Sequence, residues 1–269
     1  MMNWATDRSL EAPVPTQSSP EQVVINIPPQ EAMLTKVDEH FTQGDGFSIA
    51  TLNLDHVVKI RLNPNFRAAY ARHDYVVADG NPIVWLSRLA GQNVGLVPGS
   101  ELIDPVIALA EKHQVPVGFV GSTENSLALA TAELLRRYLG LIIATSISPA
   151  MGFDPAGQEA DAAIEALAAA KVGLCLIALG APKQEIFAAR AQERFDTAGF
   201  ISIGAGLDFI SGEQTRAPAW VRAIAAEWLW RLLLSPARLM RRYGACFAIL
   251  PGLTWTAWRA RNASNKGEA

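Results

Sequence analysis

The stretch Leu179-Gly-Ala-Pro-Lys-Gln-Glu185 decides the fold class of this chain. The apolar run before it, 172–178, predicts a buried strand, and residues 186–195 have the spacing of a helix with polar positions on one side. A glycine in the turn and a proline at about the first helical position are typical of a strand-to-helix junction. In a parallel sheet such a junction directs backbone N–H groups, together with Lys183 and Gln184, towards a ligand above the strand ends. We therefore expect an anionic, phosphate-bearing ligand here.

Short apolar runs alternate with longer helical segments from Phe47 onward. The runs short enough for strands are residues 47–52, 75–78, 115–121, 141–147, 172–179 and 200–204. The segments with helical spacing are residues 55–72, 82–89, 101–113, 124–138, 158–170 and 184–195. This alternation predicts an α/β fold, with a Rossmann-like, largely parallel sheet and helices on both faces.

Length and composition exclude several classes of protein. A chain of 269 residues with 50% hydrophobic content can bury one large core. The net charge of −3 gives no overall field that favours nucleic acid. Cys175 and Cys246 lie far apart in apolar runs, which indicates a reduced, cytoplasmic setting. The first 30 residues lack the apolar stretch of a signal peptide, and no run reaches the ~18–20 apolar residues of a membrane span.

Composition divides the chain into four parts. Residues 1–30 predict a disordered leader and residues 262–269 a disordered tail, on either side of an α/β core, 31–212, and an appendage, 213–261. The appendage contains eight arginines and five of the seven tryptophans, and it predicts one or two amphipathic helices that break near Ser235-Pro236. Arginine and tryptophan together are typical of a helix at a membrane interface; the alternative is a helix packed on the core with solvated arginines.

Thr51 and Asn53 stand at the end of the first predicted strand, with one apolar residue between them. They therefore project on one face at the carboxyl end of the strand, where open α/β sheets bind ligands. Two interpretations are open: a ligand contact, or capping of the next helix by Asn53 or Asp55. For Asp55 we favour capping.

Asp79 follows the second predicted strand, before Gly80 and a proline that opens a helix. A carboxylate at this point either caps the helix, which is the common role, or acts on a ligand as a base. Because Asp79, Thr51 and Gln184 all lie at strand ends on one edge of the sheet, we favour catalysis.

Two further glycine-containing segments are weaker signals. At the junction 117–124, Ser122 or Thr123 is the expected N-cap, and the N–H groups after Gly121 can hold a phosphate or a uracil edge. Residues 204–209 resemble a dinucleotide fingerprint but have Phe209 in place of the third glycine, so we predict no dinucleotide site.

Metal chemistry is not expected. No Asp-x-Asp pair is present to hold a divalent metal with a nucleotide diphosphate. No ligand spacing relates the four histidines, His40, His56, His73 and His113. We expect neither metal nor cofactor, so that helix N-termini and Lys or Arg side chains would stabilise a departing diphosphate.

Several motifs occur in a fixed order between Phe47 and Tyr243. In the core they are Thr51-x-Asn53, Ala78-Asp-Gly80 with Trp85 and Arg88, Val97-Pro-Gly-Ser-Glu-Leu102, Gly180-Ala-Pro-Lys-Gln-Glu185 and Gly204-Ala-Gly-Leu-Asp-Phe209. In the C-terminal part they are Arg216-Ala-Pro, Glu227-Trp-Leu-Trp-Arg231, Pro236-Ala-Arg238 and Arg241-Arg-Tyr243. Together they resemble the bacterial WecG/TagA/CpsF-type glycosyltransferases (glycosyltransferase family 26).

The resemblance implies an inverting, metal-independent transferase. Its donor would be a UDP-sugar, with N-acetylmannosamine, its uronic acid, glucose and galactose as candidate sugars, and its acceptor a polyprenyl-diphosphate-linked saccharide. The setting would be cell-envelope or exopolysaccharide synthesis, by a cytoplasmic protein peripheral to the inner face of the bacterial membrane. A homo-oligomer remains open.

The resemblance also assigns site residues. It matches the catalytic base to Asp79, with Thr51 and Gln184 as partners. We expect substrate contacts from Asn53, Gly80, Gly121, Ser122, Gly180, Pro182, Lys183, Glu185, Arg231, Arg238 and Arg241. For Lys183, a solvated side chain is the alternative. The C-terminal arginines would recognise the lipid diphosphate at an anionic membrane surface. Members often carry arginine where this chain has Leu96, so a donor contact by that arginine is not carried over.

Two other functions remain open. One is a non-catalytic module that binds a nucleotide sugar at the same sheet edge. The other is a nucleic-acid-binding protein that uses the arginines and tryptophans of the appendage. The acidic composition and the polar cluster at the strand ends argue against the second.

Overall fold

A computed structural model describes residues 25–26, 30–218, 220–221, 227–234 and 236–267. Most of the predicted leader therefore lies outside the described residues. Of that leader, Asn26 lies beside the second strand: its backbone N–H donates to Val76 O (3.3 Å), and its side-chain Oδ1 accepts from Val76 N–H (2.8 Å).

Six parallel strands form one sheet in the order β2-β1-β6-β5-β3-β4. They are β1 (Phe47–Leu52), β2 (Tyr75–Ala78), β3 (Val117–Gly121), β4 (Ile143–Ile147), β5 (Leu174–Ala178) and β6 (Gly199–Ser202). All-parallel pairing confirms the predicted α/β fold and places every carboxyl end at one edge of the sheet.

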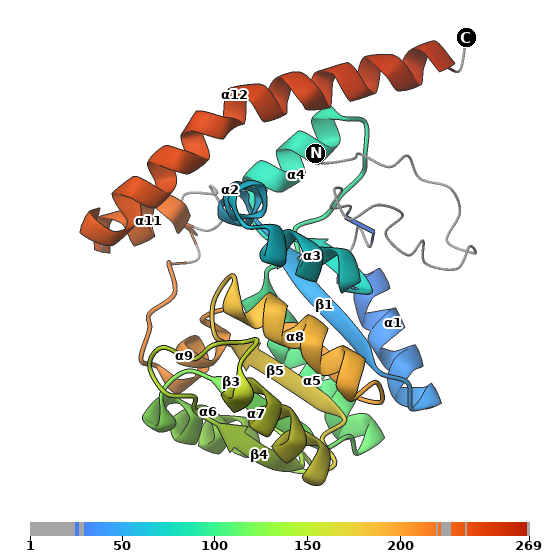
Figure 1. The fold of residues 1–269 in the computed structure, drawn as a ribbon, viewed down its shortest axis with the longest axis vertical. Coiled ribbons are helices and arrows are strands. Elements are labelled where there is room, and N and C mark those ends of the chain that lie inside the picture. The colour runs from blue at the N-terminus through green and yellow to red at the C-terminus, as the bar shows by residue number, and fades with distance from the viewer. Residues whose placement is uncertain (1–24, 27–29, 219, 222–226, 235, 268–269) are drawn as a thin grey trace.

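Helices cover both faces of the sheet, as predicted (Figure 1). One face packs against α1 (Gln30–Gln43), α5 (Gly99–His113), α6 (Glu124–Arg137) and α9 (Gly206–Ser211). The other face carries α2 (Leu54–Leu62), α3 (Pro64–Arg72), α4 (Asn81–Leu89), α7 (Gln158–Ala169) and α8 (Lys183–Arg194). Alternate residues of each strand face opposite layers, as Ile49 and Ala50 do in β1.

The single helix predicted over 55–72 was wrong, because two helices meet at Asn63. Pro64 has no N–H to donate to the preceding turn, and it disfavours helical dihedrals in the residue before it. Asn63 is accordingly extended (φ −124°, ψ 104°), and its side chain accepts from Phe66 N–H at the start of α3.

The described residues that follow the core include the helices α11 (Glu227–Leu234) and α12 (Pro236–Gly267), with the predicted break between them. The longer one, α12, lies across α2 and α4 at one end of the domain (Figure 1). Its residues Leu253 and Ala257 are buried in the same cluster as Val57 of α2 and Leu86 of α4. On its outer side Trp255 and Trp258 stack with ring centroids 5.1 Å apart and are 59% and 46% exposed. In the part of the chain that the structure describes, no helix has the length and apolarity to cross a bilayer.

Candidate active site

The junction between β5 and α8 is held by the side chain of Gln184. The chain leaves β5, passes through a cis Ala181–Pro182 bond and enters α8 at Lys183. Gln184 is 2% exposed, and its Oε1 accepts from the N–H groups of Gly180 and Gly204, both at 3.2 Å. One amide oxygen thus joins the turns that follow β5 and β6.

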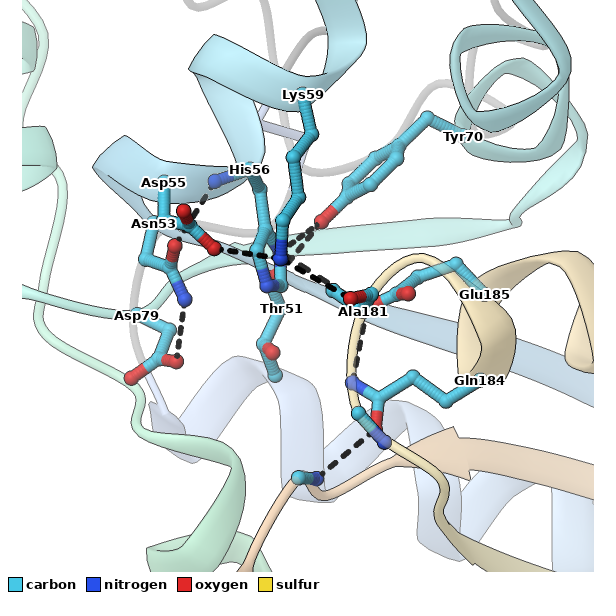
Figure 2. A network of polar contacts seen from close by, with 12 residues as sticks. Thr51, Asn53, Asp55, His56, Lys59, Tyr70, Asp79, Ala181, Gln184 and Glu185 are labelled. Atoms are coloured by element: carbon cyan, nitrogen blue, oxygen red, sulfur yellow. Dashed lines mark hydrogen bonds and ion pairs between the residues drawn. The ribbon is translucent and has the colours of Figure 1, made fainter. Parts of the chain in front are cut away.

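Glu185 holds the other end of that amide. Gln184 Nε2 donates to Glu185 Oε1 (2.8 Å; Figure 2), and Glu185 is fully buried. Burial raises the pKa of Glu185 to about 7. Its Oε2 has no hydrogen-bond partner among the described residues. Although we expected Glu185 to bind substrate, its carboxyl lies beneath the surface and contacts Gln184.

His56 and Tyr70 form a second buried group, at the end of β1. The Tyr70 hydroxyl donates to Thr51 O (2.7 Å), and His56 Nδ1 lies 2.8 Å from the same oxygen and 2.6 Å from the Tyr70 hydroxyl. His56 Nδ1 is also 3.8 Å from Glu185 Oε1. Burial lowers the pKa of His56 to about 3, so the imidazole is neutral near pH 7.

This group was not predicted, because His56 was considered only as a metal ligand, and the spacing of the four histidines does not match that of metal ligands. The available signal was its position, three residues after the N-cap Asn53, in the first turn of the helix that follows β1.

Asn53 and Asp79 lie side by side at the ends of neighbouring strands. The register pairs Leu52 with Ala78, so the next residues in each strand are level. Asn53 Oδ1 accepts from His56 N–H (3.0 Å), as an N-cap, while its Nδ2 donates to Asp79 Oδ2 (3.4 Å; Figure 2). Asn53 is therefore the N-cap of α2, which is one of the two roles that the sequence left open, and its contact with a ligand stays a prediction.

Asp79 lies one residue before the N-cap of the helix that follows it. The N-cap of α4 is Gly80, which makes no side-chain cap and has a φ of +116°, a conformation that favours glycine. The Asp79 N–H donates to Leu52 O (2.8 Å), and its half-buried carboxyl lies at the rim of the sheet. Thr51 is beside it in β1, with Cγ2 against Gly99.

The β3–α6 junction lies farther along the same edge, beyond β5. Thr123 is the N-cap of α6. Ser122 donates its N–H to Ala178 O and its hydroxyl to Asp208 Oδ1. Asp208 also accepts from Ser126 Oγ and Gln214 Nε2. The sequence analysis missed Asp208 as the acceptor that joins α6 to α9.

Of the four cationic residues predicted to bind substrate, the structure describes the side chains of two. Lys183 is half-buried at the first turn of α8, and Arg241 is exposed on α12. Arg231 and Arg238 lie in helices, but their side chains are outside the described residues. Among the residues that the structure describes, no group of three or more His, Cys, Asp or Glu is placed to hold a metal ion.

The four strands at the centre and one side of the sheet thus bring Asp79, Asn53, Thr51 and the Gln184 turn to one rim. A half-exposed carboxylate beside fixed amide and backbone groups is an arrangement suited to proton transfer from a bound hydroxyl.

Comparison with known proteins identifies the chain. A relative from Bacillus spizizenii, described as an N-acetylglucosaminyldiphosphoundecaprenol N-acetyl-beta-D-mannosaminyltransferase, is 27% identical over 204 residues, which cover 75% of this chain and 77% of the relative. The model of the glycosyl transferase WecG/TagA/CpsF family matches residues 22–267. This match spans the sheet, the rim and α12 together, and the chain therefore belongs to the WecG/TagA/CpsF family and is a glycosyltransferase.

Proposed function

We propose that this glycosyltransferase moves a hexose or N-acetylhexosamine-type sugar from a UDP-sugar to a polyprenyl-diphosphate-linked saccharide, with inversion and without a metal. The name of the relative, which specifies N-acetylmannosamine transfer to a lipid-diphosphate-linked sugar, supports this choice of substrates. The product would enter the synthesis of a cell-envelope polysaccharide.

The observation that carries the proposal is the Asp79 carboxyl at the rim, level with Asn53. In the proposed step Asp79 takes the proton of the acceptor hydroxyl as that oxygen attacks the anomeric carbon of the donor. The bond from that carbon to the UDP oxygen breaks on the opposite side, which inverts the configuration. A general base of this kind contributes about 10²- to 10⁴-fold to the rate.

Gln184 has a supporting role in this mechanism. Its amide oxygen and nitrogen are already hydrogen-bonded to Gly180, Gly204 and Glu185. It therefore sets the shape of the rim, and a direct hydrogen bond to sugar would require it to give up one of these contacts. The Gly180 N–H is already bonded to Gln184 Oε1, so stabilisation of departing UDP falls to Lys183 and to the three appendage arginines expected to contact substrate, Arg231, Arg238 and Arg241.

We further propose that α12 attaches the enzyme to the inner face of the cell membrane. Trp255 and Trp258 are exposed on its outer side, and Arg241 is exposed nearer its start. Tryptophan beside arginine suits the headgroup region, where each basic residue contributes roughly 1 kcal/mol. Attachment would be reversible and weakened by salt.

The test is a screen of UDP-sugars against a short-chain lipid-diphosphate saccharide with purified protein, with and without a metal chelator. Transfer of one sugar with inverted configuration, undiminished by the chelator, is expected. Saturable UDP-sugar binding without turnover on any acceptor would favour the non-catalytic nucleotide-sugar module instead. Loss of transfer with chelator would contradict the metal-free mechanism.

A further inference from the structure

A line of charged contacts connects α12 to the turn that carries Gln184. Arg242 of α12 forms an ion pair with Asp55 Oδ2 in the first turn of α2 (3.0 Å). Lys59, one turn later, lies 2.7 Å from the same oxygen and donates to the backbone oxygen of Ala181 (3.0 Å; Figure 2). Asp55 is nearly buried, and both cations lie against the same carboxylate oxygen.

Ala181 lies in the turn that Gln184 and Lys59 both contact. It lies in the turn between β5 and α8, next to Gly180, whose N–H donates to Gln184 Oε1. The turn is thus held from within by Gln184 and from outside by Lys59. Since the ammonium of Lys59 is flexible on its own, Asp55 limits where it can lie, and Arg242 in turn limits Asp55.

The sequence analysis treated Arg242 as part of a basic surface for lipid. In the structure its side chain is 43% exposed, and its guanidinium forms an ion pair with Asp55. Arg241 beside it is exposed on the same helix. Neighbouring arginines of α12 therefore have different roles.

We propose that Lys59 and Arg242 are positioning residues that act through Asp55 and Ala181 O, so that the seating of α12 on α2 sets the geometry of the Gln184 turn. The activity assay for this inference rests on the proposed function, whereas the predicted effect on the Gln184 turn does not. Arg242 would raise the rate without touching donor or acceptor.

A double-mutant cycle tests the connection. Arg242→Gln and Asp55→Asn are each expected to lower kcat/KM by about 3- to 30-fold, which lies within the range of coupling found in one contact network. If Arg242 acts through Asp55, adding Arg242→Gln to Asp55→Asn produces no further loss, and Arg242→Lys, which keeps the charge, recovers most of the rate. The assay uses a short-chain acceptor without vesicles, so binding to lipid headgroups does not enter.

The matched control is Arg259→Gln, an exposed position on the same helix. It should leave the rate unchanged. Losses that multiply in the double variant would overturn the proposal and assign Arg242 a direct contact with substrate.

Hydrogen exchange supplies a readout that needs no substrate. In the native protein Gln184 N–H donates to Gly180 O (3.1 Å), and this amide reports on the turn. Lys59→Met, Asp55→Asn and Arg242→Gln should each accelerate exchange of the peptide 179–186, while Arg259→Gln should not. Unchanged exchange in folded variants, as judged by circular dichroism, would refute the proposal. An absence of glycosyl transfer by the wild type would refute the proposed function and leave this result standing.

Discussion

Gln184 Nε2 donates a hydrogen bond of 2.8 Å to the carboxylate of its neighbour Glu185, and both side chains are buried. Above about pH 7, where Glu185 is ionised, its carboxylate can only accept, so it fixes which end of the Gln184 amide faces the Gly180 and Gly204 N–H groups. A buried acid thus sets the orientation of a group at the rim without reaching the surface.

The first prediction concerns pH and Glu185. Burial raises its folded pKa to about 7, from 4.5, so the folded protein binds a proton that the unfolded chain releases. Its contribution to stability is complete below about pH 4.5 and is lost as the pH rises to about 7, a change of about 3 kcal/mol. Relative to the wild type, Glu185→Gln should therefore gain stability over this interval, as measured by urea unfolding at several pH values.

Comparison with the wild type removes the other titrating groups from this test. Burial lowers the pKa of His56 to about 3 and that of His73 to about 4. These two histidines therefore lower the stability of the folded protein as the pH falls below about 6.5, and they do so in both the variant and the wild type. The exposed Glu193→Gln on the same helix is the control. Parallel curves for Glu185→Gln and wild type would contradict the prediction.

Asp79→Asn should lower kcat by about 10²- to 10⁴-fold, because the amide cannot take the acceptor proton. The side chain is half-buried at the rim, so the free energy of unfolding should change by only about 0.5 kcal/mol. Product formation from donor and short-chain acceptor gives the rate, and thermal unfolding gives the stability. A stable variant with near-normal turnover would eliminate Asp79 as the base.

Gly99→Ala should disturb the rim from below. A methyl group there would lie 3.0 Å from Ser202 O and 3.1 Å from Thr51 Cγ2, which is closer than ordinary contact. We expect a loss of about 1–3 kcal/mol in stability, together with reduced activity, because Thr51 must move. Gly244→Ala in α12, where nothing lies within 4 Å, is the control and should be neutral or slightly stabilising. Equal stabilities of the two variants would argue against the close packing.

The two sides of α12 should separate stability from membrane binding. Leu253 is 3% exposed, and Leu253→Ala should cost about 2–5 kcal/mol in a core shared with α2 and α4. Replacement of exposed Trp255 and Trp258 by serine should leave the melting temperature nearly unchanged and reduce sedimentation with anionic vesicles. Full vesicle binding by the double serine variant would exclude this face as the membrane contact.

The strands β1 and β2 could be predicted to the residue: β2 is an uninterrupted apolar run between Asp74 and Asp79, and β1 is a mainly apolar run, with Ser48 and Thr51 in it, between Gly46 and Asn53. The break at Asn63 was missed although Pro64 signals it, and helix α1 was not predicted although Met33, Val37 and Phe41, spaced four residues apart, lie on its packed side.

Some contacts of the candidate site could likewise be predicted from the sequence, and others could not. That Asn53 and Asp79 are neighbours follows from the rule that parallel strands end at one edge. The Tyr70 hydroxyl reaches Thr51 O only because α3 packs over β1, and no local pattern encodes that contact. Nor can composition distinguish an arginine that pairs with Asp55 from one that meets a phosphate in lipid.

Strand β6 lies between β1 and β5, although it is the last strand to be synthesised. Until residues 199–202 leave the ribosome, the nascent chain can form only two separate pieces of sheet, β2-β1 and β5-β3-β4, with facing edges that have no partner. Pairing of Phe47 with Gly199 also closes a very long loop, which slows folding. Chains that terminate before Ser202 should therefore be prone to aggregation, and chaperone demand should fall sharply once this short strand has emerged.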